Sequence, residues 1–237
     1  MYSSGYTKSP TLWEIILSQT LKTIALLGGT GNEGGGLAFR WAHYGHQVII
    51  GSRQQEKAEN AAAELNALLG ENVVRGMTNA ESASHADIVI LTVPYAAHKA
   101  TLESVKDQLQ GKILIDVTVP LQPPRVDVVA LPAGRTAAEE AVALLGPGVR
   151  IVSAFQNVSA AHLKDINYVV ECDVLISGDD PEAKAQALAL AEAAGMRGVD
   201  AGPLANAIVA ESLTSVLIAI NKRYKVKASG IRITGID

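Results

Sequence analysis

The chain has 237 residues, of which 48% are hydrophobic and only 4% aromatic, and its formal net charge is −4 at pH 7. The apolar content argues against disorder, and the acidic balance gives no reason to expect a nucleic-acid partner. The single cysteine, Cys172, excludes an internal disulfide and a multi-thiolate metal site, so we expect a cytoplasmic protein with no metal. We also expect no membrane partner, because no apolar run approaches the ~20 residues that a membrane span needs.

The first half of the chain alternates apolar runs of strand length with segments of helical period. The apolar runs lack the alternation of a half-exposed strand, which indicates strands buried on both faces. Strands are expected at 22–28, 47–52, 72–76, 87–93 and 112–118. Helices are expected at 37–44, at 55–69, around Glu81 and at 96–109. This order predicts a doubly wound parallel sheet.

The second half continues with α/β elements in a less regular order. Helices are expected at 136–146, 181–195 and 204–224, and strands at 150–155 and 168–178. We therefore expect an α/β protein with an N-terminal extension over 1–21, a Rossmann-type domain over 22–148 and a smaller C-terminal domain over 149–237. The helix at 204–224 has apolar faces too broad for a lone surface helix, so we expect it to pack against the first domain or to form a homodimer.

Six glycines fall within nine positions directly after the first predicted strand, in the stretch GGTGNEGGG. Gly29, Gly31 and Gly34 form a G-x-G-x-x-G motif between a strand and a helix. In this setting the first glycine makes the turn, the second lets a pyrophosphate approach the backbone and the third lets the helix pack on the strand. The motif predicts a dinucleotide-binding loop; the alternative is a tight strand–helix turn with no ligand.

The end of the second predicted strand indicates which dinucleotide binds. NAD-binding proteins usually place an acidic residue there to bind the ribose hydroxyls. This chain has GSRQQEK instead, in which the Ser52 hydroxyl and the Arg53 guanidinium suit a 2′-phosphate, and Lys57 lies one helical turn beyond. We predict NADP rather than NAD, the alternative being a solvated helix start with ordinary surface cations.

No set of acid–base catalytic residues is evident. The stretch YAAHK contains the Tyr-x-x-x-Lys pattern of short-chain dehydrogenases, but Tyr95 and Lys99 come far too early in the chain for that family. Hydride exchange between two bound coenzymes needs mainly alignment, so the absence of such a set favours that chemistry.

Five stretches occur in this order: ALLGGTGNEGGGLA, GSRQQEKAE, DIVILTVP, VSAFQNVSA and DAGPLANAIVAESLT. Over about residues 22–237 the chain thereby resembles the F420-dependent NADP oxidoreductases. The resemblance implies hydride transfer between the nicotinamide of NADP(H) and C5 of the deazaflavin coenzyme F420, which is the second substrate. The C-terminal domain would then complete the deazaflavin cleft.

The resemblance also implies roles for particular residues. The phosphate loop would comprise Gly29, Thr30, Gly31, Asn32, Glu33 and Gly34. The 2′-phosphate would be held by Ser52, Arg53 and Lys57. The nicotinamide half would be lined by Val93, Pro94 and Tyr95. The deazaflavin slot would be framed by Ser153, Ala154, Phe155, Pro203 and Leu204.

Two departures from the family pattern lie in the phosphate loop. Glu33 stands where the family usually has an apolar residue, and its carboxylate would repel the pyrophosphate unless it points to solvent. Gly35 occupies a place that is often basic.

Two other functions stay open: an NADP-dependent reductase of a small imine or carbonyl compound, and a non-catalytic NADP-sensing domain. A cleft with room for a tricyclic ring favours the F420 enzyme, whereas a small polar pocket with a placed acid favours the imine reductase.

Overall fold

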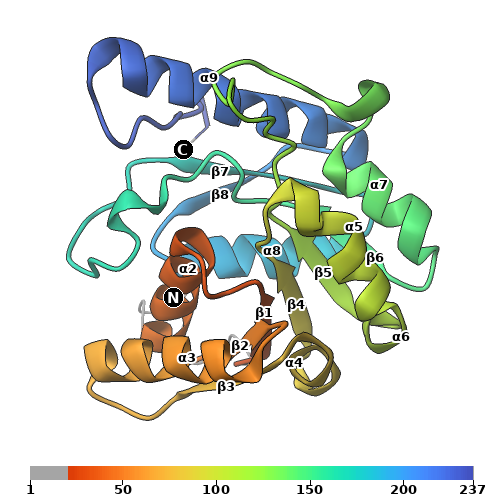
Figure 1. Ribbon diagram of the computed structural model, residues 1–237. Coiled ribbons are helices and arrows are strands. Elements are labelled where there is room, and N and C mark those ends of the chain that lie inside the picture. The colour runs from red at the N-terminus through yellow and green to blue at the C-terminus, as the bar shows by residue number, and fades with distance from the viewer. Residues whose placement is uncertain (1–20, 237) are drawn as a thin grey trace, which may run out of the picture.

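The computed structural model describes residues 21–236, so the predicted extension over 1–21 lies almost wholly outside the described residues. Eight strands form one sheet with helices on both faces (Figure 1). The strands are β1 (Thr23–Leu27), β2 (Gln47–Ser52), β3 (Val74–Thr78), β4 (Ile88–Leu91), β5 (Ile113–Asp116), β6 (Arg150–Ser153), β7 (Asp173–Gly178) and β8 (Arg197–Asp200). Their order is β3-β2-β1-β4-β5-β6-β7-β8. The first six are parallel and only β6–β7 is antiparallel, which confirms the predicted Rossmann-type α/β fold.

The helices cover the sheet in two layers. They are α2 (Asn32–Tyr44), α3 (Gln55–Leu69), α4 (Asn79–His85), α5 (Tyr95–Ser104), α6 (Lys106–Leu109), α7 (Ala137–Leu145), α8 (Pro181–Ala193) and α9 (Ala207–Tyr224), with short 3-10 turns η1 (Pro132–Gly134), η2 (Ala160–His162) and η3 (Leu204–Asn206). Along β1, Ile24 and Leu26 face the core beneath α2, α3 and α8, whereas Ala25 and Leu27 face the core beneath α4 to α7. Burial on both faces explains the unbroken apolar runs of these strands.

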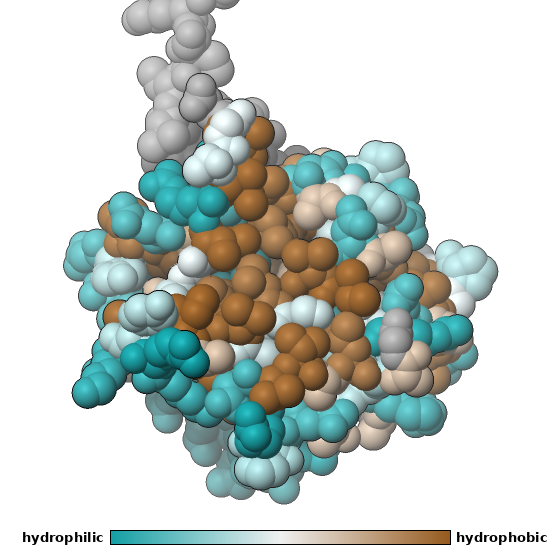
Figure 2. All heavy atoms as spheres, turned by 90° about the horizontal axis from the view of Figure 1, so that it is seen from above, coloured by the Kyte–Doolittle hydropathy of each residue, from teal (hydrophilic) through white to brown (hydrophobic). Residues whose placement is uncertain are grey.

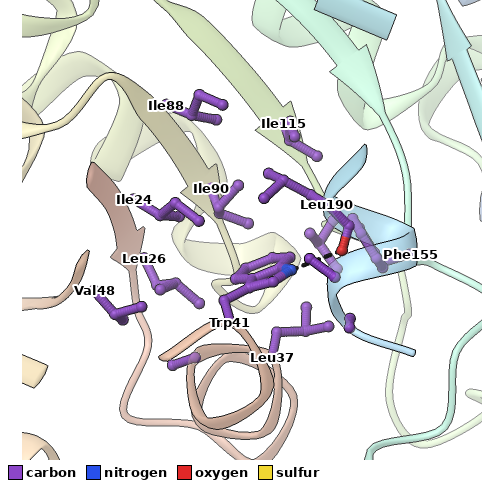
Figure 3. Packing of buried hydrophobic residues seen from close by; sticks show 14 of the residues in the cluster. Ile24, Leu26, Leu37, Trp41, Val48, Ile88, Ile90, Ile115, Phe155 and Leu190 are labelled. Carbon is purple, nitrogen blue, oxygen red and sulfur yellow. Dashed lines mark hydrogen bonds between the residues drawn. The ribbon is translucent and has the colours of Figure 1, made fainter. Parts of the chain in front are cut away.

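Helix α2 joins the glycine loop to the C-terminal part of the chain. The indole of Trp41 is fully buried, packs edge-on against Phe155 and donates to the Leu190 carbonyl at 2.8 Å (Figure 3). The guanidinium of Arg40 donates to carbonyls of Leu163, Asp165, Tyr168 and Ala194 at 2.9 to 3.0 Å, and to that of His162 at 3.3 Å. Because β6 also pairs with β5, the sheet and its core continue across the boundary predicted near Gly148.

The structure differs from the sequence-based expectation in four main places. Strand β8 was not expected, and the strand expected at 168–178 begins only at Asp173. Helix α2 begins at Asn32 rather than at Leu37 and includes the buried glycines Gly34, Gly35 and Gly36. The helix expected at 96–109 is two helices, because Val105 adopts φ −126° and ψ 13° between them.

The last helix requires a correction of the expectation that no run approaches the length of a membrane span. The segment Leu204–Tyr224 is long and apolar enough to cross a membrane by length and composition, with a mean hydropathy of 1.5. It also packs against the rest of the protein: Ala207, Ala210 and Leu217 are buried, and Oε2 of Glu211 accepts the Ala137 N–H at 2.8 Å. One such helix is weak evidence for a membrane, because the core helix of a soluble protein has the same properties.

Candidate coenzyme site

A cleft of about 960 Å³ opens at the carboxyl ends of β1, β2, β4 and β5. The strand order reverses between β1 and β4, and this switch point is where open parallel sheets bind their ligands. The cleft has two ends. One is lined by the glycine loop and the start of α3, and the other by residues that follow β4, β5 and β6 together with one residue of α9.

The glycines of the loop have two different roles: some allow close packing of α2, and others leave the backbone accessible to a ligand. A β-carbon on Gly34 would lie 2.5 Å from Thr92 Oγ1 and 2.9 Å from Gly29 Cα, so close packing forbids a side chain there. A β-carbon on Gly31 would meet only the Gly28 carbonyl oxygen, at 3.8 Å. Gly31 lines the cleft and precedes α2 as its N-cap, without a side-chain hydrogen bond to the helix. Open space over this helix N-terminus is the arrangement that binds an anion such as a pyrophosphate.

The predicted 2′-phosphate residues come together at the same end of the cleft. Ser52 ends β2, and Arg53 and Lys57 lead into and begin α3; all three line the cleft. Within residues 21–236, neither Arg53 nor Lys57 forms an ion pair, so both exposed cations are free to bind an anion. No carboxylate follows β2 directly, as the sequence indicated.

The residues predicted for the nicotinamide half and those predicted for the deazaflavin slot differ in where the structure places them. Val93 and Pro94 line the cleft, whereas Tyr95 lines a separate cavity of about 610 Å³ between α5 and α7. There the Tyr95 hydroxyl donates to Glu140 Oε2 at 2.9 Å, and burial together with this carboxylate raises the pKa of Tyr95 to about 12. Four of the five residues predicted for the deazaflavin slot are buried and do not line the cleft: Ser153, Ala154, Phe155 and Leu204. Pro203 is exposed and does not line the cleft either.

The end of the cleft that follows β4, β5 and β6 is formed by residues that the sequence analysis did not single out. They are Thr92, Val117, Thr118, Val119, Leu121, Gln156, Val158 and Thr214. The side chain of Gln156 is buried and held in place, because its Nε2 donates to the Asp116 carbonyl at 2.7 Å and to Ser153 Oγ at 2.8 Å. The Thr214 hydroxyl of α9 donates to the Gln156 carbonyl at 2.7 Å. The stretch VSAFQNVSA of the family resemblance contained Gln156 and Val158, and was the signal that could have found them.

Unpartnered polar atoms cluster at the cleft. Within residues 21–236, six buried side-chain polar atoms have no hydrogen-bond partner, and four of these belong to cleft-lining residues. They are Glu33 Oε1, Asn79 Oδ1, Thr118 Oγ1 and Gln156 Oε1. Buried polar atoms are normally paired, so this concentration fits a polar ligand that spans both ends of the cleft.

A buried ion pair joins α5 to the end of β5. His98 Nε2 is 2.7 Å from Asp116 Oδ2, and both side chains are almost inaccessible to solvent. Burial lowers the pKa of His98, but the hydrogen bond and charge of Asp116 outweigh it and raise that pKa above its ordinary value. Across the described part of the chain, no group of three His, Cys, Asp or Glu residues is placed to hold a metal ion.

The sheet order, the switch-point cleft and the glycine loop define a dinucleotide-binding protein of the Rossmann class. The profile of the family described as NADP oxidoreductase coenzyme F420-dependent matches residues 23–120. The F420-dependent NADP reductase of Methanothermobacter marburgensis is 44% identical over 220 residues, which cover 90% of this chain and 98% of that protein. The F420-dependent NADP reductase of Methanothermobacter thermautotrophicus is 42% identical, covering 90% and 95%. The chain belongs to the family of F420-dependent NADP reductases, as its sequence stretches predicted.

A solved structure agrees with this fold. The crystal structure of a hypothetical protein from Sinorhizobium meliloti superposes with a TM-score of 0.64, covering 83% of this chain and 89% of that one. At 24% sequence identity, the likeness shows the shared α/β fold alone.

Proposed function

We propose that this chain transfers a hydride between NADP(H) and the deazaflavin coenzyme F420. The observation that carries the proposal is the similarity, over nine-tenths of the chain, to relatives named F420-dependent NADP reductase. The cleft supports it, because about 960 Å³ is at the upper end of the range for small-molecule sites and suits more than one ring system.

NADP(H) would occupy the end of the cleft formed by the glycine loop. The backbone at Gly31 and the N-terminus of α2 would hold the pyrophosphate. Ser52, Arg53 and Lys57 would hold the 2′-phosphate, since Arg53 offers paired N–H donors and Lys57 adds a charge. Val93 and Pro94 would then border the nicotinamide.

The deazaflavin would lie at the other end, against the apolar side chains that follow β5 and β6. Gln156 Oε1 and Thr118 Oγ1 are the unpartnered polar atoms there and would orient the polar edge of the ring. In this proposal Ser153 acts from behind the wall by holding the Gln156 amide. Ala154, Phe155 and Leu204 support the wall through their packing in the core.

The residues at this end of the cleft suit transfer by alignment. Bound NADPH would supply the hydride, and the cleft would hold the two rings face to face. No charged side chain lines the cleft at this end. The lining residues there are Thr92, Val93, Pro94, Ala97, Thr101, Val117, Thr118, Val119, Leu121, Gln156, Val158 and Thr214. With no charged side chain at this end, orientation of the two rings would be the main contribution of the protein.

The finer expectations from the sequence belong to the same proposal. The protein would be cytoplasmic, with no nucleic-acid or membrane partner. It would be a homodimer that pairs through α9, where Ile208, Val209 and Val216 are 39%, 57% and 44% exposed. Figure 2 shows hydrophobic atoms gathered on the face of the molecule that lies uppermost in Figure 1, where α9 is found. The boundary near Gly148 would separate the NADP half from the half that completes the cleft.

A spectrophotometric assay tests the proposal. Purified protein is mixed with NADP⁺ and reduced F420, and in the reverse direction with NADPH and F420, with FMN, FAD and a small cyclic imine as alternative acceptors. We expect turnover with F420 and none with the flavins. Turnover with the imine alone would favour an imine reductase, and NADPH binding without any turnover would favour an NADP-sensing domain.

A further inference from the structure

Glu33 is an acidic side chain inside a loop built to bind anions. It occupies the first turn of α2, two residues beyond Gly31, and lines the cleft. The residue is only partly exposed, and its Oε1 is buried without a hydrogen-bond partner. One carboxyl oxygen, Oε1, is therefore shielded from solvent, and the partly exposed remainder of the side chain borders the cleft in which a pyrophosphate would lie.

The charges near Glu33 do not compensate for its burial. The cations that line the cleft are Arg53 and Lys57 at the start of α3. Lys164, which follows η2, lies beside Gly35, two residues beyond Glu33 in α2. None of these forms an ion pair with Glu33, and Thr92, which follows β4, is neutral. Burial raises the pKa of Glu33 to about 8, although the helix N-terminus favours the carboxylate.

We propose that Glu33 couples dinucleotide binding to a proton: its neutral carboxyl group donates a hydrogen bond to the pyrophosphate, and its carboxylate form repels the same group. This inference rests on the proposed binding of NADP(H) to the glycine loop. The proton comes from solvent when the ligand binds above the pKa of the free protein and returns to solvent when the ligand leaves.

The coupling has a defined dependence on pH. The negative pyrophosphate raises the pKa of Glu33 further in the complex, so the complex binds a proton more tightly than the free protein does. Below about pH 8 the group is protonated in both states, and affinity does not depend on its titration. Above that pH, binding takes up one proton, so the dissociation constant rises toward about tenfold per pH unit.

The test compares the wild-type protein with Glu33→Gln and Glu33→Leu across pH 6.5 to 9.5. Glu33→Gln keeps an uncharged hydrogen-bond donor. Glu33→Leu has an apolar side chain that cannot titrate, and it serves as the second variant if the first fails to fold. Glu56→Gln is the matched control, because Glu56 occupies the first turn of α3 and is exposed. Titration calorimetry gives the dissociation constants of NADP⁺ and NAD⁺. Repeating it in two buffers with different ionisation enthalpies counts the protons taken up.

We expect wild type and Glu56→Gln to lose affinity for both dinucleotides above pH 8 and to take up as much as one proton on binding. The Glu33 variants should keep a flatter profile and take up fewer protons. Because NAD⁺ has the pyrophosphate but no 2′-phosphate, the same loss with NAD⁺ assigns the effect to the loop rather than to Arg53 or Lys57. If all four proteins bind the dinucleotides and their dissociation constants depend on pH in the same way, this inference is overturned while the proposed function stands. Absence of binding at every pH would overturn it together with the proposed function.

Discussion

Gly34 and Thr92 are so close that a β-carbon on Gly34 would lie 2.5 Å from the Thr92 hydroxyl oxygen. Thr92 follows β4 and Gly34 is in the first turn of α2, so this contact fixes the helix against the strand beside β1. Gly31, three residues earlier, faces open space. The two glycines therefore have separable roles, one in packing and one in access to the backbone.

We predict that Gly34→Ala destabilises the fold. The added methyl group would contact the Thr92 side chain and the Gly29 backbone, and overpacking of this kind costs about 1–3 kcal/mol. Urea unfolding followed by circular dichroism measures the change. An unchanged unfolding midpoint would show that the contact relaxes without cost.

We predict that Gly31→Ala folds normally but loses dinucleotide binding. Its φ of −80° and ψ of 170° suit alanine, and its β-carbon would meet nothing closer than 3.8 Å in the free protein. The same methyl group would occupy the space over the helix N-terminus that we assign to the pyrophosphate. Fluorescence titration with NADPH, beside an unfolding curve, separates the two effects, and wild-type affinity would contradict the placement of the pyrophosphate.

We predict that Arg53→Ala weakens NADPH binding by about 1–3 kcal/mol, the scale of a hydrogen bond to a charged group, and hardly alters NADH binding. The reason is that only NADPH carries the 2′-phosphate. Arg75→Ala is the control, because Arg75 is exposed on β3 and does not line the cleft. Equal losses for NADPH and NADH in the Arg53 variant would refute the assignment.

We predict that Val209→Asp converts a dimer into a monomer. Val209 is 57% exposed on α9 beside other exposed apolar residues, and a carboxylate there would be buried unpaired in the interface. Light scattering at micromolar concentration gives the mass. Val169→Asp should leave it unchanged, because Val169 is 74% exposed but lies outside α9. A wild-type protein that is monomeric would refute the proposed interface.

We predict that the titration of Glu211 lowers stability as pH rises. Burial raises its pKa from 4.5 to about 8, although the backbone N–H groups of Ala137 and Ala138 donate to it. Between these two pH values the folded state keeps a proton that the unfolded state releases. Stability therefore falls by at most about 1.4 kcal/mol per pH unit from this group.

Glu211→Gln tests this by removing the titration while keeping an oxygen acceptor. Urea unfolding at pH 5, 6.5 and 8 should show that the variant gains stability relative to wild type as pH rises. Glu192→Gln, at an exposed position of α8, should show no such trend. A difference between Glu211→Gln and wild type that is constant with pH would refute the prediction.

The sequence predicted the elements whose pattern is local. The parallel strands are apolar on both faces, the glycine motif has fixed spacing, and Ser52, Arg53 and Lys57 follow a strand that is easy to recognise. Strand β8 was missed because its residues, RGVD, become a strand only by pairing with β7. Gln156 and Thr214 were missed for the same reason, since their places in the cleft depend on contacts between segments 58 residues apart.

Glu33 shows a second limit of prediction from sequence. The sequence placed its charge in the phosphate loop, but only the packed structure shows whether the carboxyl group points to solvent. Burial of Oε1 is a property of the folded structure, which the residue type and its place in the motif do not reveal. Leu204 is comparable: its motif was recognisable, but its burial in the core depends on η3 folding back against the sheet.

The bonds that Arg40 and Trp41 make have a consequence for how the protein is synthesised. The ribosome completes α2 early, yet the carbonyls that accept from these two side chains lie between residues 162 and 194. Until that part of the chain has emerged, a guanidinium and an indole would have no partners inside a nascent core, and burying them unpaired is costly. The helix that bears the phosphate loop thus reaches its final setting late in translation.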